Sequence, residues 1–188
     1  IEFTHDDLQA VISQREIGGD TRDFASALRH VVRQNPDIIF IGEMRDSETV
    51  QMAVSAAMTG HLVAATMHTI DVQQTVERIL NFFPEDVREQ VALDLSLVLR
   101  GIVSQRLLPR RDGQGRVPAF EILLNTPLVQ RLIANRELEV LPEVIKSSGN
   151  QGMVSFNRSI LQLYQGGVVS LDIAANAASH KEEFLLLA

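Results

Sequence analysis

The sequence predicts an α/β fold with a mostly parallel sheet, followed by a small all-helical subdomain. Short apolar runs rich in β-branched residues alternate with segments whose apolar residues recur at helical spacing. This alternation is typical of parallel βαβ units. After residue 125 the pattern changes to short helical segments separated by glycine-containing turns. We therefore expect a core domain over residues 1–125 and a helical subdomain over residues 126–188.

The first predicted helix spans residues 23–33, where Phe24, Leu28 and Val31 recur at helical spacing. Asp20 or Thr21 is available to cap its start. Pro36 closes the segment, because proline interrupts a helix.

Two strands are expected to follow, each buried on both faces. The first covers residues 37–41 and ends at Gly42 and Glu43, and the second covers residues 61–67 after Gly60. Further helices are predicted between and after these strands, at residues 47–59 and 71–83.

The rest of the core is predicted to contain one more helix and a hairpin. Pro84 at a first helical turn opens a helix that reaches about residue 100. Extended runs at 102–108 and 117–124 flank a turn signal at 112–115. The subdomain beyond is predicted to contain short helices at residues 126–135, 141–147, 155–164 and 170–178, and residues 180–188 form a loose helix or tail.

Composition excludes several classes of protein. The 188 residues are 45% hydrophobic, which suffices for one principal core, and no apolar run is long enough to span a membrane. The net charge of −7, with arginines scattered among acids, makes nucleic acid an unsuitable partner. The chain has no cysteine, which excludes disulfides and a thiolate zinc site and leaves the cytoplasm as the expected location.

Ligands of open parallel sheets bind at the carboxyl ends of the strands, so polar residues that close a strand are the first candidates for a site. Glu43 closes the first strand, where P-loop enzymes place an acid that acts on Mg²⁺ or on water. Its alternative role is to interact with the dipole of the following helix. His68 closes the second strand and could sense a terminal phosphate, or it could be a structural hydrogen-bonding group.

Other candidates are less specific. His61 would lie roughly 23 Å from His68 along an extended strand, at about 3.3 Å per residue, so it suits the opposite rim or a subunit interface. Glu2 lies in what we interpret as the remnant of another strand, or as a frayed terminus. Four arginines can pair with phosphate or with nearby acids such as Glu16, Asp23, Asp37 and Asp46, and they are Arg15, Arg29, Arg33 and Arg45.

A phosphate-binding loop of the form GxxxxGK[ST] is absent from the sequence. The only lysines, Lys146 and Lys181, do not follow a glycine-rich loop. Residues 1–3 have neither an initiator methionine nor a signal-peptide pattern. We expect the sequence to be a fragment of a longer protein that lacks the Walker A region, with no nucleotide bound to the fragment itself.

Three ordered motifs resemble those of the type II/IV secretion ATPase superfamily. Residues 34–49, with Ile41-Gly42-Glu43-Met44-Arg45-Asp46, resemble its atypical Walker B segment, and residues 59–69 resemble its His box. Residues 1–3 with 14–16 look like the end of its Asp box, and the similarity continues to Pro127. Without cysteines for a four-cysteine zinc element, the sequence is more similar to the PilT/PilU-type pilus retraction branch. Within that branch, residues 128–133 depart from the PilT-type pattern, and together with residues 81–84 and 94–97 they indicate a resemblance to the PilU-type members.

The resemblance implies a fold, a reaction and partners. It implies the C-terminal part of a RecA-like P-loop NTPase core, in a homo-hexamer that hydrolyses ATP with Mg²⁺ to power pilus retraction and twitching motility. Glu2 and Glu43 would be the acidic catalytic residues, with His61 and His68 as the His-box histidines and the arginines at phosphate or subunit contacts. A paralogous retraction ATPase and the inner-membrane platform protein at the pilus base are the further partners implied.

Two alternatives stay open from the sequence. The fragment by itself would alternatively be a non-catalytic oligomerisation or interaction module. The parent protein would alternatively be a pilus-assembly or type II secretion ATPase.

Overall fold

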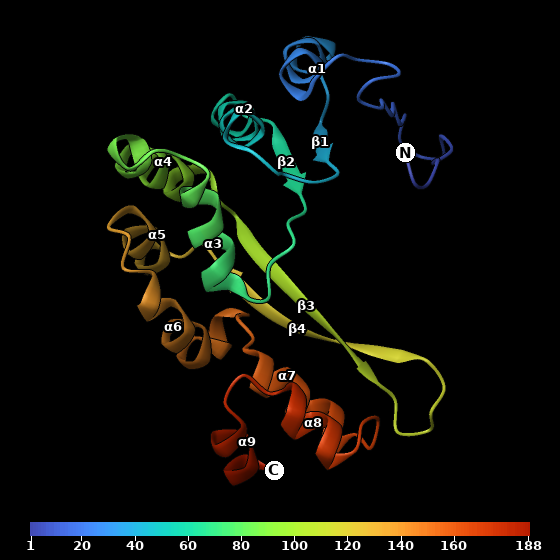
Figure 1. Ribbon diagram of the computed structural model, residues 1–188, viewed down its shortest axis with the longest axis vertical. Helices are drawn as coiled ribbons and strands as arrows, with labels where there is room; N and C mark the ends of the chain where they lie inside the picture. The colour runs from blue at the N-terminus through green and yellow to red at the C-terminus, as the bar shows by residue number, and fades with distance from the viewer. The chain divides into compact units, whose positions relative to one another are not determined.

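The computed structural model describes residues 1–188, which form two compact units, Ile1–Met67 (unit 1) and His68–Ala188 (unit 2) (Figure 1). The boundary predicted near residue 125 falls within unit 2, and a domain division of the protein at that residue stays a prediction. None of the helices combines the length and the apolar character needed to cross a membrane.

Unit 1 has the predicted strand–helix–strand order. Its elements are α1 (Phe24–Val31), the 3₁₀ helix η1 (Val32–Gln34), β1 (Ile38–Ile41), α2 (Ser47–Met58) and β2 (Leu62–Ala65). β1 and β2 pair in parallel, with Ile38 opposite Leu62 and Ile41 opposite Ala65. The parallel βαβ unit predicted from the sequence is therefore confirmed.

The cap of α1 is Asp23 rather than Asp20 or Thr21, because the Asp23 carboxylate accepts from the Ser26 N–H at 2.6 Å.

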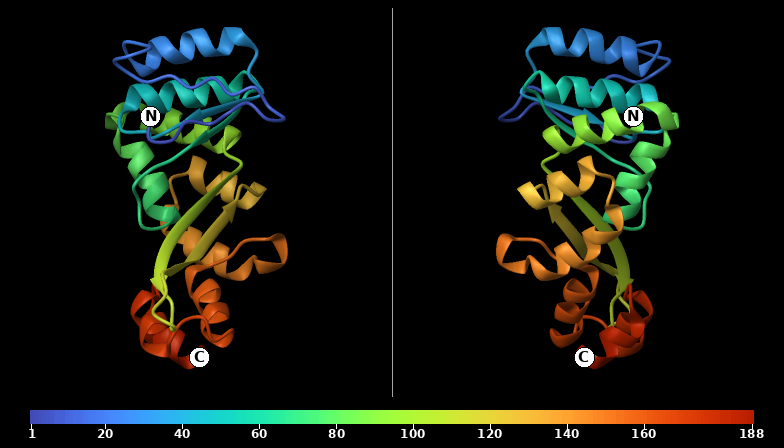
Figure 2. Two further views of the ribbon diagram at one scale, coloured as in Figure 1. Left: turned by 90° about the vertical axis from the view of Figure 1, so that its right-hand side faces the viewer. Right: turned by 90° about the vertical axis from the view of Figure 1, so that its left-hand side faces the viewer.

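The small sheet of unit 1 is covered on one face. Ile39 and Ile41 of β1 are buried in a core with residues of α1 and α2, and Figure 2 shows these two helices side by side. The alternate residues of β1 are open, with Ile38 61% and Phe40 70% exposed. The prediction that these strands are buried on both faces is wrong for this chain, because α1 and α2 cover one face only.

The strand predicted at residues 1–3 is not formed. These residues are irregular and exposed, and the unit 1 sheet contains β1 and β2 only. An extended segment needs a neighbouring strand to pair its N–H and C=O groups. Here the Gln14 side chain takes the place of a neighbouring strand. It donates to the Phe3 carbonyl at 2.9 Å and accepts from the His5 N–H at 2.7 Å.

Unit 2 combines a long hairpin with helices. Its elements are α3 (Val72–Asn81), α4 (Glu85–Val98), β3 (Gly101–Pro109), β4 (Arg116–Leu124), α5 (Pro127–Ala134), η2 (Leu138–Val140), α6 (Leu141–Ser147), η3 (Gly149–Gln151), α7 (Phe156–Gln165), α8 (Leu171–Ala177) and α9 (Lys181–Leu187). The hairpin is confirmed, with β3 and β4 antiparallel from Gly101 opposite Leu124 to Pro109 opposite Arg116. Its turn contains Gly113 and Gly115 at φ of 73° and 77°, where an L side chain would be strained.

The two faces of the hairpin differ. Side chains alternate along a strand, so Leu108 points to one face and Leu107 to the other. Leu108 is 2% exposed and joins a core with Ala119, Phe156 and Ile160, whereas Leu107 is 51% exposed. Helices α3, α7 and α8 contact the hairpin, and Figure 1 shows α7 and α8 beside it. The hairpin thus supplies one wall of the unit 2 core.

A carboxylate also lies on the covered face. Glu121 is 9% exposed, and its Oε2 accepts from the Val72 N–H at the start of α3, at 2.9 Å. Burial raises the pKa of Glu121, and the nearby Asp71 charge acts in the same direction. The Val72 and Phe156 N–H groups and the Arg106 charge act against that rise.

Adjacent leucines on β3 test this burial. Leu108→Ala should lower the free energy of unfolding of the chain by about 2–5 kcal/mol, since it removes a fully packed side chain. Leu107→Ala is the matched control and should change it by less than about 1 kcal/mol. Urea denaturation followed by circular dichroism measures both, and equal losses would contradict the assigned faces of β3.

Glu121 should give the stability of the chain a specific pH dependence. Its pKa is raised in the folded chain, so the stability it contributes is present below its unfolded pKa, about 4.3, and is lost as pH rises through the folded pKa. Relative to Glu121→Gln, the wild type should therefore lose stability between acid and neutral pH. Urea midpoints across this range measure the effect, with exposed Glu139→Gln as the control. A constant difference between wild type and Glu121→Gln would refute it.

Candidate functional site

Glu43 lies in the loop that leaves the carboxyl end of β1. Backbone hydrogen bonds continue past the paired strands, from the Thr66 N–H to the Ile41 carbonyl at 3.3 Å and from the Met44 N–H to the Thr66 carbonyl at 3.0 Å. The Thr66 hydroxyl also donates to the Gly42 carbonyl. The loop that carries Glu43 is thereby tied to the segment after β2. Both strands end at this edge, which is where parallel sheets bind ligands.

The Glu43 carboxylate is held by Arg45. The Nε and Nη2 groups of Arg45 both donate to Glu43 Oε2, and the two side chains are 77% (Arg45) and 18% (Glu43) exposed. The hydrogen bond and the charge of Glu43 raise the pKa of Arg45. The Arg45 end of this pair lies in solvent, so water can replace Arg45 as the partner of Glu43.

Of the nearby acids that the sequence offered to the arginines, Asp46 has another role in the structure. Asp46 is the N-cap of α2, and its carboxylate accepts from the Thr49 N–H at 2.8 Å. A carboxylate at this position stabilises a helix start, because it satisfies an unpaired N–H group. Arg45 pairs instead with Glu43, two residues before it.

The two histidines of the predicted site differ in position. His61 precedes β2, and its Nδ1 lies 3.1 Å from the Ala56 carbonyl and 3.2 Å from the Thr59 hydroxyl. A proton on Nδ1 lets the ring donate to the Ala56 carbonyl and so bond the last turn of α2. This places His61 at the amino end of β2, whereas Glu43 follows the carboxyl end of β1.

His68 follows β2 by a few residues and is exposed at the start of unit 2. Its backbone carbonyl accepts from Arg78 of α3 at 3.2 Å. The next residue, Thr69, is also anchored, since its hydroxyl lies 2.6 Å from that of Thr75. The main chain around His68 is thus held by α3.

The remaining predicted residues lie in other parts of unit 1. Glu2 is exposed in the irregular first segment. Arg29 and Arg33 are exposed on α1 and η1, and Arg15 donates to Gln34 of η1 at 3.0 Å. Arg45 differs from these three in that its guanidinium is paired with the Glu43 carboxylate.

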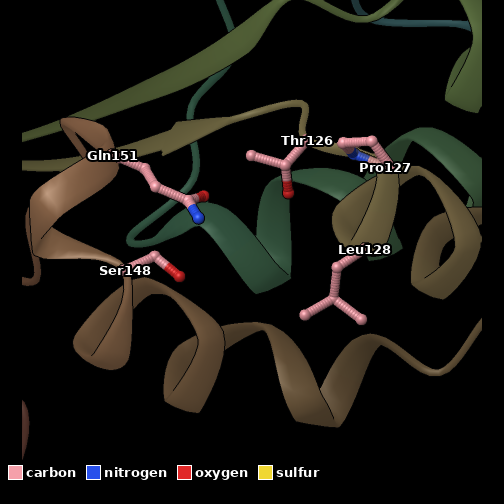
Figure 3. A pocket seen from close by; sticks show the side chains of 5 residues that line it. All are labelled: Thr126, Pro127, Leu128, Ser148 and Gln151. Atoms are coloured by element: carbon pink, nitrogen blue, oxygen red, sulfur yellow. The ribbon is translucent and has the colours of Figure 1, made fainter.

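A pocket of about 500 Å³ in unit 2 involves none of these residues. It opens between the start of α5 and the segment after α6, and its lining residues are Thr126, Pro127, Leu128, Ser148 and Gln151 (Figure 3). Thr126 is already used there as the N-cap of α5, accepting from the Val129 N–H. The pocket has no charged side chain in its lining and therefore offers no cation that could pair with a phosphate.

Arg106 and Glu121 are charged residues that the sequence reasoning missed. Both lie on the covered face of the hairpin, Arg106 beside Ala119 and Glu121 beside Ser104. The signal that would have found them is period-two alternation, because they occupy positions in register with the buried Leu108 and Leu123.

Residues 2–152 match the family model described as "Type II/IV secretion system protein". The chain belongs to this family. Among the members, it is 45% identical over 188 residues to the type IV pilus ATPase PilU of Pseudomonas aeruginosa, across 100% of this chain and 49% of that protein. It is 38% identical over 184 residues to PilT of the same organism, a type IV pilus retraction ATPase, across 98% of this chain and 53% of that protein.

A solved structure of the family agrees with this assignment. The crystal structure of the pilus retraction motor PilT with bound ADP superimposes with a TM-score of 0.86 at 40% identity, covering 97% of this chain and 51% of that chain. The chain therefore spans about half the length of the family members that it matches. It shares their mixed α/β fold, with a small sheet.

Proposed function

We propose that the whole protein is a hexameric motor that hydrolyses ATP to power type IV pilus retraction and twitching motility. The observation that carries this proposal is likeness along the full chain to PilU and PilT, the latter solved with ADP. The core would be RecA-like, with the chain supplying its C-terminal part and the helical region after residue 125 as a subdomain.

Glu43 is assigned the central catalytic role in this proposal. A carboxylate that closes a strand can orient the water that attacks a γ-phosphate. The tie between the Glu43 loop and Thr66 holds this carboxylate at the ligand-binding edge of the sheet. Its ion pair with the exposed Arg45 would open when a nucleotide and its cation occupy that edge.

The other predicted residues have supporting roles in the proposal. Glu2 would assist Glu43 through Mg²⁺ or water, and His68 would sense the γ-phosphate. His61 would act at a subunit interface, as would Arg15, Arg29 and Arg33. Partners would be further copies of the chain, a paralogous retraction ATPase and the platform protein at the inner-membrane base of the pilus, reached from the cytoplasm.

The described residues are compatible with Mg²⁺ only as part of a nucleotide complex. They include no group of three or more His, Cys, Asp or Glu side chains placed to hold a metal ion. Mg²⁺ in phosphate sites usually keeps several waters and needs one or two carboxylates beside the phosphate oxygens. Glu43 would be one such carboxylate, and the bound cation would neutralise charge on the phosphates.

Substitution of Glu43 tests the proposed chemistry. In the full-length protein, Glu43→Gln should lower kcat for ATP at least about 100-fold, because an amide cannot accept the proton of water. ATP binding should remain. Steady-state hydrolysis and nucleotide titration measure the two effects, with Glu48→Gln on the exposed first turn of α2 as the control. Near-normal turnover of Glu43→Gln would overturn the assignment.

The alternative, an interaction module, applies to the 188 residues taken by themselves. Since their sequence contains no GxxxxGK[ST] loop, we expect them not to bind Mg·ATP at micromolar nucleotide. Isothermal titration of the isolated chain measures this, beside the full-length protein as the positive control. Tight Mg²⁺-dependent binding by the isolated chain would contradict the prediction.

A further inference from the structure

The guanidinium of Arg106 joins three segments of unit 2 that are far apart in the sequence. Its Nη1 donates to the Ala177 carbonyl at the end of α8, at 2.8 Å, and to the Ser179 hydroxyl at 3.2 Å. Its Nη2 donates to the Ile70 carbonyl at 3.4 Å. The group also stacks on the Phe156 ring at the start of α7, 3.9 Å from the ring centroid. One side chain on β3 therefore contacts the segment after β2 and two C-terminal helices.

Ile70 belongs to the short segment that carries His68. Around it, Arg78 donates to the His68 carbonyl, the Thr69 and Thr75 hydroxyls are paired, and the Ile70 N–H donates to the Gln74 side chain at 3.1 Å. All three bonds involve residues of α3, so the segment is anchored to this helix. Arg106 donates to the Ile70 carbonyl and also to the Ala177 carbonyl, so it connects this segment to the end of α8.

Glu121, on the neighbouring strand β4, also contacts this region, at the start of α3. Ser104 is opposite Glu121 and Arg106 is opposite Ala119, so Arg106 and Glu121 are diagonal neighbours on the same face. Glu121 accepts from the first N–H of α3, and its charge interacts with Arg106. The two charged residues on the covered face of the hairpin thus contact the segment between β2 and α3 and the first residue of α3.

We propose that Arg106 is a positioning residue that couples the His68 segment to the C-terminal helices α7 and α8. This inference rests on the proposed function, in which His68 senses the γ-phosphate. A guanidinium is planar and rigid, so a displacement of the Ile70 carbonyl turns the whole group and changes its contacts at Ala177 and on the Phe156 ring. The bond to Ile70, at 3.4 Å, is the longest of its hydrogen bonds, and we expect it to shorten when nucleotide binds. Through Arg106, a change at the His68 segment therefore alters the contacts of α7 and α8.

The test is hydrogen exchange of the full-length protein with and without a non-hydrolysable ATP analogue and Mg²⁺. In the wild type, the analogue should slow exchange of the amides at residues 174–180 about 10-fold, within the usual range of coupling between sites. In Arg106→Gln this response should fall below about 2-fold, while the dissociation constant of the analogue changes less than about 3-fold. A merely structural role would alter basal exchange throughout α7 and α8 without selectively removing the response to nucleotide.

A matched control is available on the same hairpin. Arg110 is half exposed, and its guanidinium pairs with Asp112 in the turn, so Arg110→Gln should keep the wild-type response. Arg106→Lys keeps the charge but not the planar fork, and its response should be intermediate. If Arg106→Gln does not fold, Arg106→Lys decides the question.

The outcomes separate the two proposals. Failure of the wild-type protein to bind the analogue would remove the proposed function and, with it, the coupling. Binding with no response at residues 174–180, or an equal response in wild type and the Arg106 variants, would overturn the coupling alone. A response lost in Arg106→Gln, reduced in Arg106→Lys and kept in Arg110→Gln would support it.

Discussion

The antiparallel pairing of β3 with β4 is the constraint on which unit 2 depends. Because side chains alternate along both strands, this register puts Leu108, Ala119 and Leu123 on one face, together with Arg106 and Glu121. Helices pack against the apolar side chains of that face. The charged members then need partners, since a buried carboxylate or guanidinium without hydrogen bonds is costly. They find them in the main chain at helix ends, at Val72 and Ala177.

Unit 1 is organised by the parallel pairing of β1 with β2. Parallel pairing brings the carboxyl ends of both strands to one edge, and the bonds made by Thr66 extend this contact into the loop that carries Glu43. The other end of this loop is fixed by Asp46, whose carboxylate caps the N-terminus of α2. Glu43 therefore stands between two anchored points, with the exposed Arg45 as its charged partner.

Much of the fold follows from local sequence patterns. The order of strands and helices in unit 1, the hairpin and the short helices after Thr126 are all visible as spacing and turn residues. The position of Glu43 after β1 follows from an apolar run that ends at Gly42. Burial was predicted less well. Ile38 and Phe40 look like core residues in the sequence, but a strand pattern does not specify which faces are covered by other elements of the chain.

The sequence by itself determined the elements, the family and the candidate carboxylate, because these depend on residue types at short spacing. The tertiary structure decided which charged groups meet. Arg45 pairs with Glu43 while Asp46 caps α2. Arg106 reaches Ile70, Phe156 and Ala177 because the hairpin brings distant segments together. Such contacts depend on strand register and helix packing over many residues, and no local pattern encodes them.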